Sequence, residues 1–287
     1  MSSKLDKIYD IIDKQNEMLE NIAFFANLAK NGQCVATGKN EVLTRLYTGQ
    51  LIYVDRRDIS VASHLIMSGF WEFETTEIFR RYIKEDSVVF DVGANFGYYG
   101  IIAGCTNNHG EIHFFEANPQ LIKYIWKSLT VNGLLARSHI NSCAVAEKSG
   151  EIRQINLLSP RWGGSSLAPV QADNNYERIT QKEVNTLSLD DYCRQHDIKR
   201  VDVIKMDIEG YEEHAFEGMT DILANNKHLV ILMEYTLGKY SDDFFPFLKN
   251  HFRVSVINNS ETQEIWDQST LDDNHDDLAM LLLEPLS

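Results

Sequence analysis

The feature that most constrains this chain is an apolar run that ends in an acid and is followed at once by a glycine-rich turn. Residues 88–100 read VVFDVGANFGYYG. The run up to Asp91 predicts a buried parallel strand, and the residues after Gly97 predict the start of a helix. Gly93 and Gly97 would let the turn between them approach a ligand, because neither carries a Cβ. Such a strand, turn and helix typically cup a nucleotide-like cofactor, whose anionic end meets free N–H groups of the helix.

The spacing of the turn narrows the choice of cofactor. A dinucleotide-binding turn has the pattern G-x-G-x-x-G, whereas here Gly93 and Gly97 flank Asn95, with Asp91 just before them. This order resembles motif I of the methyltransferases that use S-adenosylmethionine (SAM). The resemblance implies that the turn lies under the amino-acid part of SAM, with Asp91 near its ammonium group.

A second acid follows at a spacing typical of ribose-binding residues. Residues 111–115 predict a strand that ends at Glu116, about 25 residues after Asp91. A carboxylate there can accept hydrogen bonds from both hydroxyls of a ribose. The same charge would also suit the N-terminus of the helix predicted over residues 120–132. The two interpretations are compatible, and both stay open on the sequence.

A third group of polar residues follows two further buried strands. Residues 201–206 predict a strand that delivers Asp207 and Glu209 to the edge of the sheet, and another strand ends at Glu234. Ligands of open α/β sheets bind outside the carboxyl ends of the strands. We therefore expect these acids, together with His214, to face the same crevice as the acids of the first two strands.

Together these segments resemble the FkbM-type methyltransferase family. The resemblance is carried by Asp91-Val-Gly-Ala-Asn-Phe-Gly97, Phe115-Glu-Ala-Asn-Pro119, Thr186-Leu-Ser-Leu-Asp-Asp191 and Ile204-Lys-Met-Asp-Ile-Glu-Gly210, with support from Gly69-Phe-Trp-Glu72 and Gly163-Gly-Ser-Ser-Leu167. It runs from about residue 41 to about residue 283. It implies an α/β, Rossmann-like class I fold: a seven-stranded, mostly parallel sheet with helices on both faces. It also implies O-methylation by SAM of a hydroxyl on a sugar, a glycan or a secondary metabolite.

The resemblance further implies a set of cofactor contacts. The implied SAM-binding residues are Asp91, Gly93, Ala94, Asn95, Gly97, Glu116, Ala117, Asn118, Ala144, Val145 and Asp207. Ala144 and Val145 end a strand predicted over residues 139–145, and family placement puts them near the adenine ring. Ordinary core packing explains these two residues equally well.

Methyl transfer to a hydroxyl needs a general base, because a protonated hydroxyl is a poor nucleophile. Asp207 is the first candidate, and Glu209, Glu234 and His214 are the others. A helix N-terminus would keep His214 neutral and basic, although a solvent-facing position explains it as well. Asp207 and Glu234 could instead hold Mg²⁺. Two carboxylates are few for such a centre, so the sequence does not favour a metal.

Two functions of other classes compete with methyl transfer. A nicotinamide-dependent oxidoreductase would also use a strand, turn and helix, but the missing G-x-G-x-x-G pattern argues against it. A non-catalytic SAM-binding scaffold protein would keep the fold without the chemistry. Intact acids at Asp91, Glu116, Asp207 and Glu234 favour an enzyme over a scaffold.

Composition limits the partners and the compartment. The 287 residues are 44% hydrophobic, as expected of one large α/β domain with a small addition, and they carry a net charge of −15. That charge opposes unaided binding to nucleic acid and to anionic membranes. The scattered cysteines Cys34, Cys105, Cys143 and Cys193 predict free thiols, and neither a signal peptide nor a membrane span is predicted. We therefore expect a cytoplasmic protein.

The chain divides into three segments. Residues 1–30 predict one helix with a heptad seam, which either packs on its own domain or forms a coiled-coil homodimer contact, the interpretation we favour. Residues 31–72 predict a polar linker and a small cap, and residues 73–287 predict the SAM-dependent methyltransferase domain. A long irregular loop over residues 159–177 is expected to close over the acceptor. No residue identifies that acceptor beyond a small molecule or glycan.

Overall fold

The computed structural model describes residues 34–168, 178–258, 261–265 and 278–286. The helix predicted over residues 1–30, with its proposed dimer contact, lies outside the described residues. So does the later part of the loop predicted over residues 159–177.

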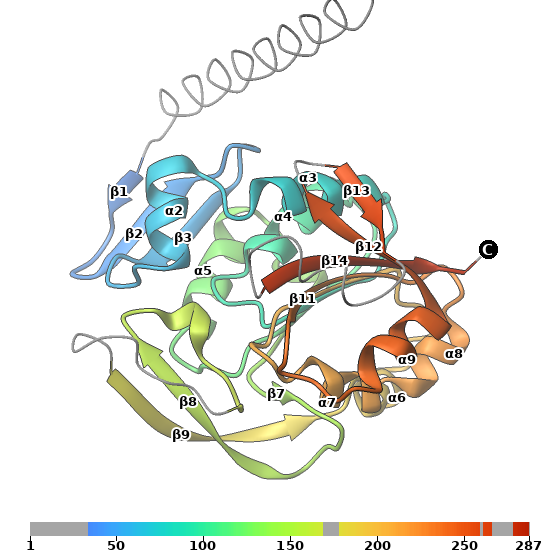
Figure 1. Ribbon diagram of the computed structural model, residues 1–287. Helices are drawn as coiled ribbons and strands as arrows, with labels where there is room; N and C mark the ends of the chain where they lie inside the picture. Colours follow the sequence, from blue (N-terminus) through green and yellow to red (C-terminus); the bar gives the residue numbers. More distant parts are fainter. Residues whose placement is uncertain (1–33, 169–177, 259–260, 266–277, 287) are drawn as a thin grey trace, which may run out of the picture.

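Within the described residues, the fold is built on a central sheet of eight strands in the order β13-β12-β14-β11-β10-β4-β5-β6 (Figure 1). The strands that pair in parallel are β4 (Val89–Val92), β5 (Ile112–Phe115), β6 (Ser138–Asn141), β10 (Val203–Met206) and β11 (Val230–Thr236). The strands that add antiparallel pairs beyond β11 are β12 (Phe252–Asn258), β13 (Glu261–Glu264) and β14 (Leu278–Pro285).

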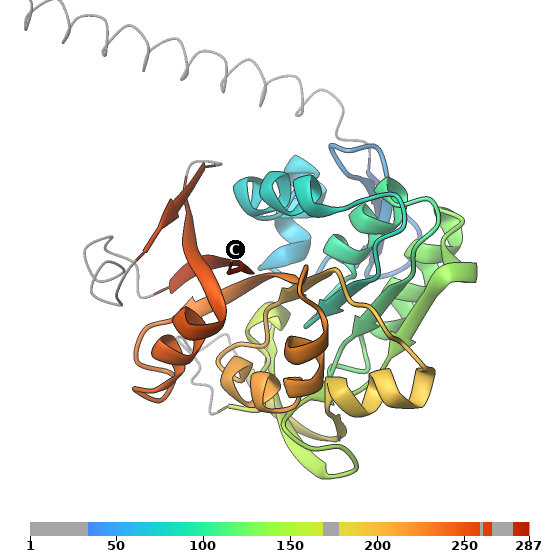
Figure 2. The same cartoon turned by 90° about the vertical axis from the view of Figure 1, so that its right-hand side faces the viewer.

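The parallel strands are apolar because helices cover both of their faces. Successive residues alternate between two cores: Val89 packs on one face of the sheet and Phe90 on the other. The helices on the Val89 face are α3 (Phe73–Tyr82), α4 (Tyr98–Thr106) and α5 (Ile122–Val131). Those on the Phe90 face are α6 (Leu189–His196), α7 (Glu212–Glu217), α8 (Thr220–Asn225) and α9 (Phe244–His251). Figure 2 shows the two helical layers on either side of the sheet.

The predicted α/β fold, with a mostly parallel sheet between helical layers, is confirmed. The sheet has one strand more than the seven expected, because β13 pairs with the edge strand β12. The sequence of β13 is ETQE and all four residues are exposed, so it offers no apolar alternation to recognise.

The strand predicted over residues 139–145 is divided in two. Its first part is β6, in the central sheet, whereas β7 (Ala144–Val145) pairs with β9 (Arg178–Leu187) in a smaller sheet. There β9 also forms a long antiparallel hairpin with β8 (Ile152–Ser159), at the lower left of Figure 1.

A second small sheet packs beside the central one. It consists of β1 (Cys34–Ala36), β2 (Glu41–Arg45) and β3 (Leu51–Asp55), and it is followed by α2 (Val61–Ser68). It lies against α5, where the Tyr53 N–H donates to Ser128 Oγ at 2.9 Å and the Tyr124 hydroxyl donates to Asp55 Oδ2 at 2.7 Å. These contacts join the sheet to the helix that follows β5 (Figure 1).

The structure also bears on the cysteines and on the question of a membrane-spanning helix. The four cysteines are free thiols, as predicted, with Cys143 and Cys193 buried and Cys34 and Cys105 exposed. Among the described helices, none has both the length and the apolar character needed to cross a bilayer.

Gly93 controls how closely the turn after β4 approaches the end of β10. Its φ is +80°, and a Cβ added there would lie 1.8 Å from the backbone oxygen of Asp207. Because backbone atoms cannot yield as side chains do, we expect Gly93→Ala to lower the free energy of unfolding by about 1–3 kcal/mol or more. Urea unfolding of the two proteins measures this loss.

The matched control for that experiment is Gly38→Ala. A Cβ on Gly38 would meet only the Glu41 Cβ, at 3.4 Å, which is ordinary contact. Its unfolding free energy should stay within about 0.5 kcal/mol of the unsubstituted protein. Equal losses in the two variants would contradict the close approach at Gly93.

Candidate functional site

Two adjoining cavities lie at the carboxyl ends of the parallel strands. They share Gly93, Asn95, Gly163 and Asp207 as lining residues. The first cavity extends toward β5 and β7, and the second extends toward β11 and the segment before α3. The cavities therefore lie at the edge of the sheet where open α/β sheets bind their ligands.

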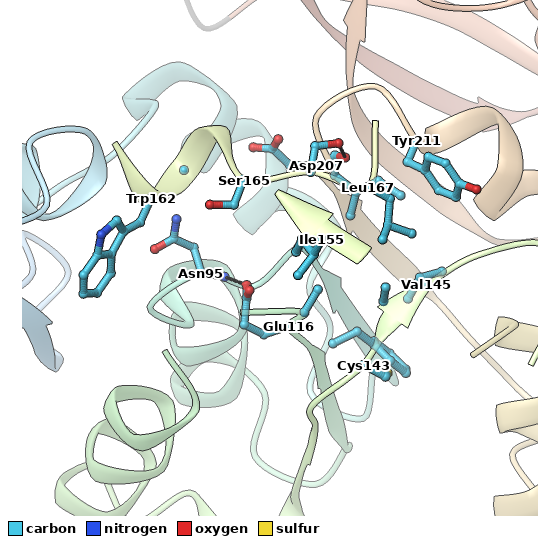
Figure 3. A pocket seen from close by; sticks show the side chains of 17 residues that line it. Asn95, Glu116, Cys143, Val145, Ile155, Trp162, Ser165, Leu167, Asp207 and Tyr211 are labelled. Carbon is cyan, nitrogen blue, oxygen red and sulfur yellow. Dashed lines mark hydrogen bonds between the residues drawn. The ribbon is translucent and has the colours of Figure 1, made fainter. Parts of the chain in front are cut away.

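The first cavity combines two carboxylates, Glu116 and the shared Asp207, with a mostly apolar wall. Glu116 and Ala117 line it from the end of β5, and Ala144 and Val145 line it from β7. Further apolar lining comes from Cys143, Ile155, Trp162 and Leu167. Figure 3 shows Glu116 next to Asn95, with Trp162 on one side of the cavity and Val145 and Cys143 on the other. A slot of this composition suits a planar, largely apolar ring.

The Glu116 carboxylate is held by backbone N–H groups. It is only 7% exposed, and its Oε1 accepts from the Asn118 N–H and its Oε2 from the Asn95 N–H, both at 2.6 Å. Burial raises the pKa of Glu116 to about 7 against the lowering effect of these two hydrogen bonds. Each carboxylate oxygen has a second lone pair, so Glu116 can still accept from the hydroxyls of a ligand.

Asp91 occupies the floor of the second cavity. It is 3% exposed, and its Oδ2 accepts from the Gly100 N–H in the first turn of α4 at 2.8 Å. Burial raises the pKa of Asp91 to about 7. Ala94 lines the same cavity. The acid at the end of β4 therefore both anchors α4 and faces the cavity.

Two of the predicted cofactor residues support the site without lining either cavity. Gly97 directly precedes α4 and has a φ of +84°. A Cβ added there would contact the side chains of Phe114 and Ile125. Asn118 is buried, and its Oδ1 accepts from the Gln120 N–H at 3.1 Å. Gly93 lines both cavities, and its closest approach is to the backbone of Asp207, the residue after β10.

His214 lies away from the acids, contrary to the sequence prediction. Its side chain is 47% exposed on α7, and its ring packs on Tyr211 with centroids 4.3 Å apart. Its Nδ1 lies 3.7 Å from Glu217 and 4.0 Å from Glu147. It lines neither cavity, because the short helix α7 turns this position toward solvent.

The other three acids predicted for catalysis come together in the second cavity. Carboxylate oxygens of Asp207, Glu209 and Glu234 lie within 4.8 Å of one another. Glu209 has a φ of +59°, which places it on the tight turn after β10. Burial, followed by repulsion from Asp207, raises the pKa of Glu209 to about 8 and that of Glu234 to about 10. The cavity therefore favours protons or cations beside these side chains.

Two charged residues of the second cavity were not predicted from the sequence. Lys205 is 2% exposed within β10, and its Nζ lies 3.5 Å from Asp207 Oδ2 and 3.8 Å from Glu72 Oε2. Glu72, on the segment before α3, also accepts from the Tyr99 hydroxyl at 2.6 Å. A lysine inside an otherwise apolar buried strand was a usable signal, because lysine is almost never fully buried without a partner.

The loop after β8 forms part of the wall between the cavities. The Trp162 N–H donates to Asp58 Oδ1 at 3.0 Å, and its ring stacks on Phe96. Ser166 Oγ donates to the Glu209 carbonyl at 3.0 Å. The described part of the loop is thus fastened both to the segment before α2 and to the turn after β10.

A second group of metal-binding residue types lies at the other end of the sheet. Glu111, His113 and His139 bring their ligand atoms within 4.8 Å of one another. The two imidazoles are stacked, with centroids 4.6 Å apart and an interplanar angle of 7°. Their lone pairs therefore lie in nearly parallel planes and do not converge on one ion.

Comparison with known proteins identifies the family. Residues 91–282 match the sequence model of the Methyltransferase FkbM domain, which is more than half of the chain. The chain belongs to this family. The matched range of the FkbM domain contains every acid that we placed at the two cavities except Glu72.

Curated relatives of this FkbM domain are distant. The hexuronic acid methyltransferase AglP of Haloferax volcanii is 25% identical over 152 residues, 52% of this chain and 56% of that protein. The methyltransferase sdnD of Sordaria araneosa is 20% identical over 163 residues, 48% of this chain and 62% of that protein. The chain therefore spans less than two thirds of the length of these relatives.

Solved structures include similar chains at low identity. The precorrin-6y C5,15-methyltransferase of Geobacter metallireducens GS-15 aligns at 16% identity with a TM-score of 0.40, covering 74% of this chain and 87% of that chain. An rRNA methylase of Streptococcus thermophilus aligns at 12% identity with a TM-score of 0.43, covering 74% and 95%.

The raised pKa of Glu234, about 10, makes a prediction about stability. The carboxyl group of an unfolded glutamate has a pKa of about 4.3, so above that pH the folded state retains a proton that the unfolded chain has released. Its contribution to stability is therefore lost as the pH rises toward the folded value. We expect Glu234→Gln to reduce the fall in unfolding free energy between about pH 6 and about pH 9.

Urea unfolding in EDTA at several pH values measures this dependence. The control is Glu217→Gln, because the Glu217 side chain is 59% exposed. That variant should keep the pH dependence of the unsubstituted protein. A Glu234→Gln curve that runs parallel to the unsubstituted one would show that Glu234 is ionised in the folded state.

Proposed function

We propose that this FkbM-family chain is an SAM-dependent O-methyltransferase that acts on a hydroxyl of a sugar, a glycan or a secondary metabolite. The observation that carries the proposal is the position of Asp207, which borders both cavities. A methyl donor in the first cavity and an acceptor in the second would meet beside this carboxylate.

The residues of the first cavity fit the cofactor that the family implies. The apolar slot suits the adenine ring, and Glu116 can accept from the ribose hydroxyls. Asp91, on the floor of the adjoining second cavity, would face the ammonium group. Asn95 Oδ1 is buried at the junction of the cavities without a hydrogen-bond partner among the described residues, as expected for an atom that contacts a polar ligand. When bound, SAM supplies an electrophilic methyl group on its sulfonium.

Asp207 is the proposed general base for the acceptor hydroxyl. A base must lie within hydrogen-bond reach of the proton and must be ionised. The pKa values of Glu209 and Glu234, about 8 and about 10, keep those carboxyls protonated near neutral pH in the free protein. Asp207 Oδ2, by contrast, is paired with the Lys205 ammonium at 3.5 Å. A carboxylate oxygen of Asp207 would take the hydroxyl proton as the new C–O bond forms.

The second cavity offers the groups that a sugar would use. The half-buried Trp71 lines it together with Tyr98 and Tyr99. The acids Glu209 and Glu234 line it as well. Aromatic faces and a few placed polar groups are typical of small-molecule sites, and carboxyl groups accept from hydroxyls. The name of the Haloferax relative, a hexuronic acid methyltransferase, supports a sugar acceptor.

The competing functions predict different binding. A nicotinamide-dependent oxidoreductase would bind NADH rather than SAM, and membership of a methyltransferase family weighs against it. A scaffold protein would bind SAM but transfer no methyl group to any acceptor. Calorimetric titration with SAM, S-adenosylhomocysteine and NADH separates the first alternative from our proposal, and turnover separates the second.

Glu116→Gln tests the cofactor site. The amide keeps an acceptor for only one of the N–H groups of Asn95 and Asn118, and it loses the charge and the second acceptor that a ribose would use. We expect SAM to bind about tenfold or more weakly, the loss typical of a hydrogen bond to a charged group. Calorimetry measures the affinity. The control His214→Ala should bind SAM normally, and equal affinities in all three proteins would refute the assignment of Glu116.

Asp207→Asn tests the general base. Loss of a general base typically slows transfer by about 10²–10⁴-fold, and the isosteric amide should leave SAM affinity within a few-fold. The assay follows labelled methyl from SAM into a panel of uronic acids, neutral sugars and glycosylated metabolites. Transfer at the unsubstituted rate by Asp207→Asn would exclude Asp207 as the base.

A further inference from the structure

The carboxylates of the second cavity have the arrangement of a cation site. Asp207 follows β10, Glu209 lies on the next turn, and Glu234 comes from the neighbouring strand β11. Their ligand oxygens lie within 4.8 Å of one another. In an octahedral site with metal–oxygen distances of about 2.1 Å, neighbouring oxygens are about 3.0 Å apart and opposite ones about 4.2 Å. Small side-chain movements would bring all three oxygens into one such shell.

Glu234 contributes an observation independent of this clustering. Glu234 is 7% exposed, and its Oε1 is buried with no hydrogen-bond partner among the described residues. Buried polar atoms in proteins are almost always partnered, so an orphaned carboxyl oxygen on a residue that lines a cavity points to a partner in that cavity: a water molecule, a hydrogen-bond donor or a cation. A cation would bind the carboxylate form of Glu234 and displace the proton that the free protein holds there.

Two nearby lysines pair with the other acids of the cluster. Lys205 Nζ approaches Asp207 Oδ2 at 3.5 Å and Lys239 Nζ approaches Glu209 Oε2 at 4.0 Å. Within the described part of the chain, neither lysine forms an ion pair with Glu234. An aspartate has two oxygens, so the pairing through Oδ2 leaves Oδ1 of Asp207 for another ligand.

The cavity as a whole carries an excess of acids. The carboxyl side chains that line it are Glu72, Asp91, Asp207, Glu209 and Glu234, and the cationic ones are Arg161 and Lys205. Buried like charges repel strongly, because little solvent screens them. A small ion of high positive charge compensates such a group more effectively than a second ammonium, which is larger and must donate hydrogen bonds.

We propose that Asp207, Glu209 and Glu234 bind one hard divalent cation, Mg²⁺ or Mn²⁺, in the second cavity. Donor sets made only of carboxylates select such ions over soft transition metals. Three monodentate carboxylates leave coordination positions for water and for an oxygen of the acceptor. This inference rests on the proposed function for its role: the ion held by these three carboxylates would make a nearby acceptor hydroxyl more acidic, so that a base would remove its proton more easily.

Binding of Mn²⁺ to the full-length protein tests the site without any turnover. The protein is stripped with EDTA, exchanged into buffer without SAM, and titrated with MnCl₂ while electron paramagnetic resonance measures the free ion. We expect saturable binding of one ion per chain, with competition by Mg²⁺. Glu234→Gln should bind Mn²⁺ at least about tenfold more weakly, as when other metal-site contacts are removed.

The matched control is Glu217→Gln, an exposed acid on the adjacent helix α7, which should bind Mn²⁺ as the unsubstituted protein does. Thermal melting checks that each variant is folded, and Asp207→Asn replaces Glu234→Gln, with the same expected loss, if that variant does not fold. Absence of saturable Mn²⁺ binding, or equal affinity in Glu234→Gln, would overturn the proposal.

SAM titrations in EDTA and in Mn²⁺ separate this inference from the proposed function. Binding of SAM without any binding of Mn²⁺ would overturn the cation site and leave the methyltransferase proposal intact. Binding of Mn²⁺ that depends on Glu234, without binding of SAM, would support the cation site and refute the proposed cofactor.

Discussion

The close packing of the turn after β4 against the end of β10 is the contact on which the site depends. Gly93 stands where any Cβ would overlap the Asp207 carbonyl. Its N–H donates to the Phe115 carbonyl at 2.9 Å, which ties the same turn to the end of β5. One glycine thus links three neighbouring parallel strands at their carboxyl ends. Because of this packing, Asp91, Glu116 and Asp207 line two adjoining cavities. Gly93 lines both of them.

The concentration of acids at this edge opposes folding. Burial raises the pKa of Asp91 and of Glu116 to about 7, so both carboxyls lose much of their preference for ionisation. Proteins retain such arrangements at functional sites, where perturbed carboxyl groups bind ligands or transfer protons. The buried Lys205 offsets part of the repulsion from within β10, and a bound cofactor and cation would offset more.

Much of the site could be predicted because strand ends are visible in the sequence. The apolar runs before Asp91, Glu116, Asp207 and Glu234 mark strands, and a parallel sheet aligns their carboxyl ends. His214 was misplaced because the orientation of a short helix depends on its packing against neighbours, which local spacing does not report. The hairpin partner β9 and the edge strand β13 were missed for a similar reason. All residues of β13 are exposed, and the buried residues of β9, Val184 and Thr186, lie only near its end.

The sequence by itself determined the fold class, the family and the acids at the strand ends, because these depend on the order of apolar runs, turns and charges along the chain. Only the tertiary structure decided which charges share a cavity. Lys205 and Glu72 are more than a hundred residues apart in the chain, yet their charged groups lie 3.8 Å apart. It also showed that Glu234 Oε1 is buried without a partner. Such facts arise from long-range packing, in which the distance between two side chains is set by all the elements that lie between them.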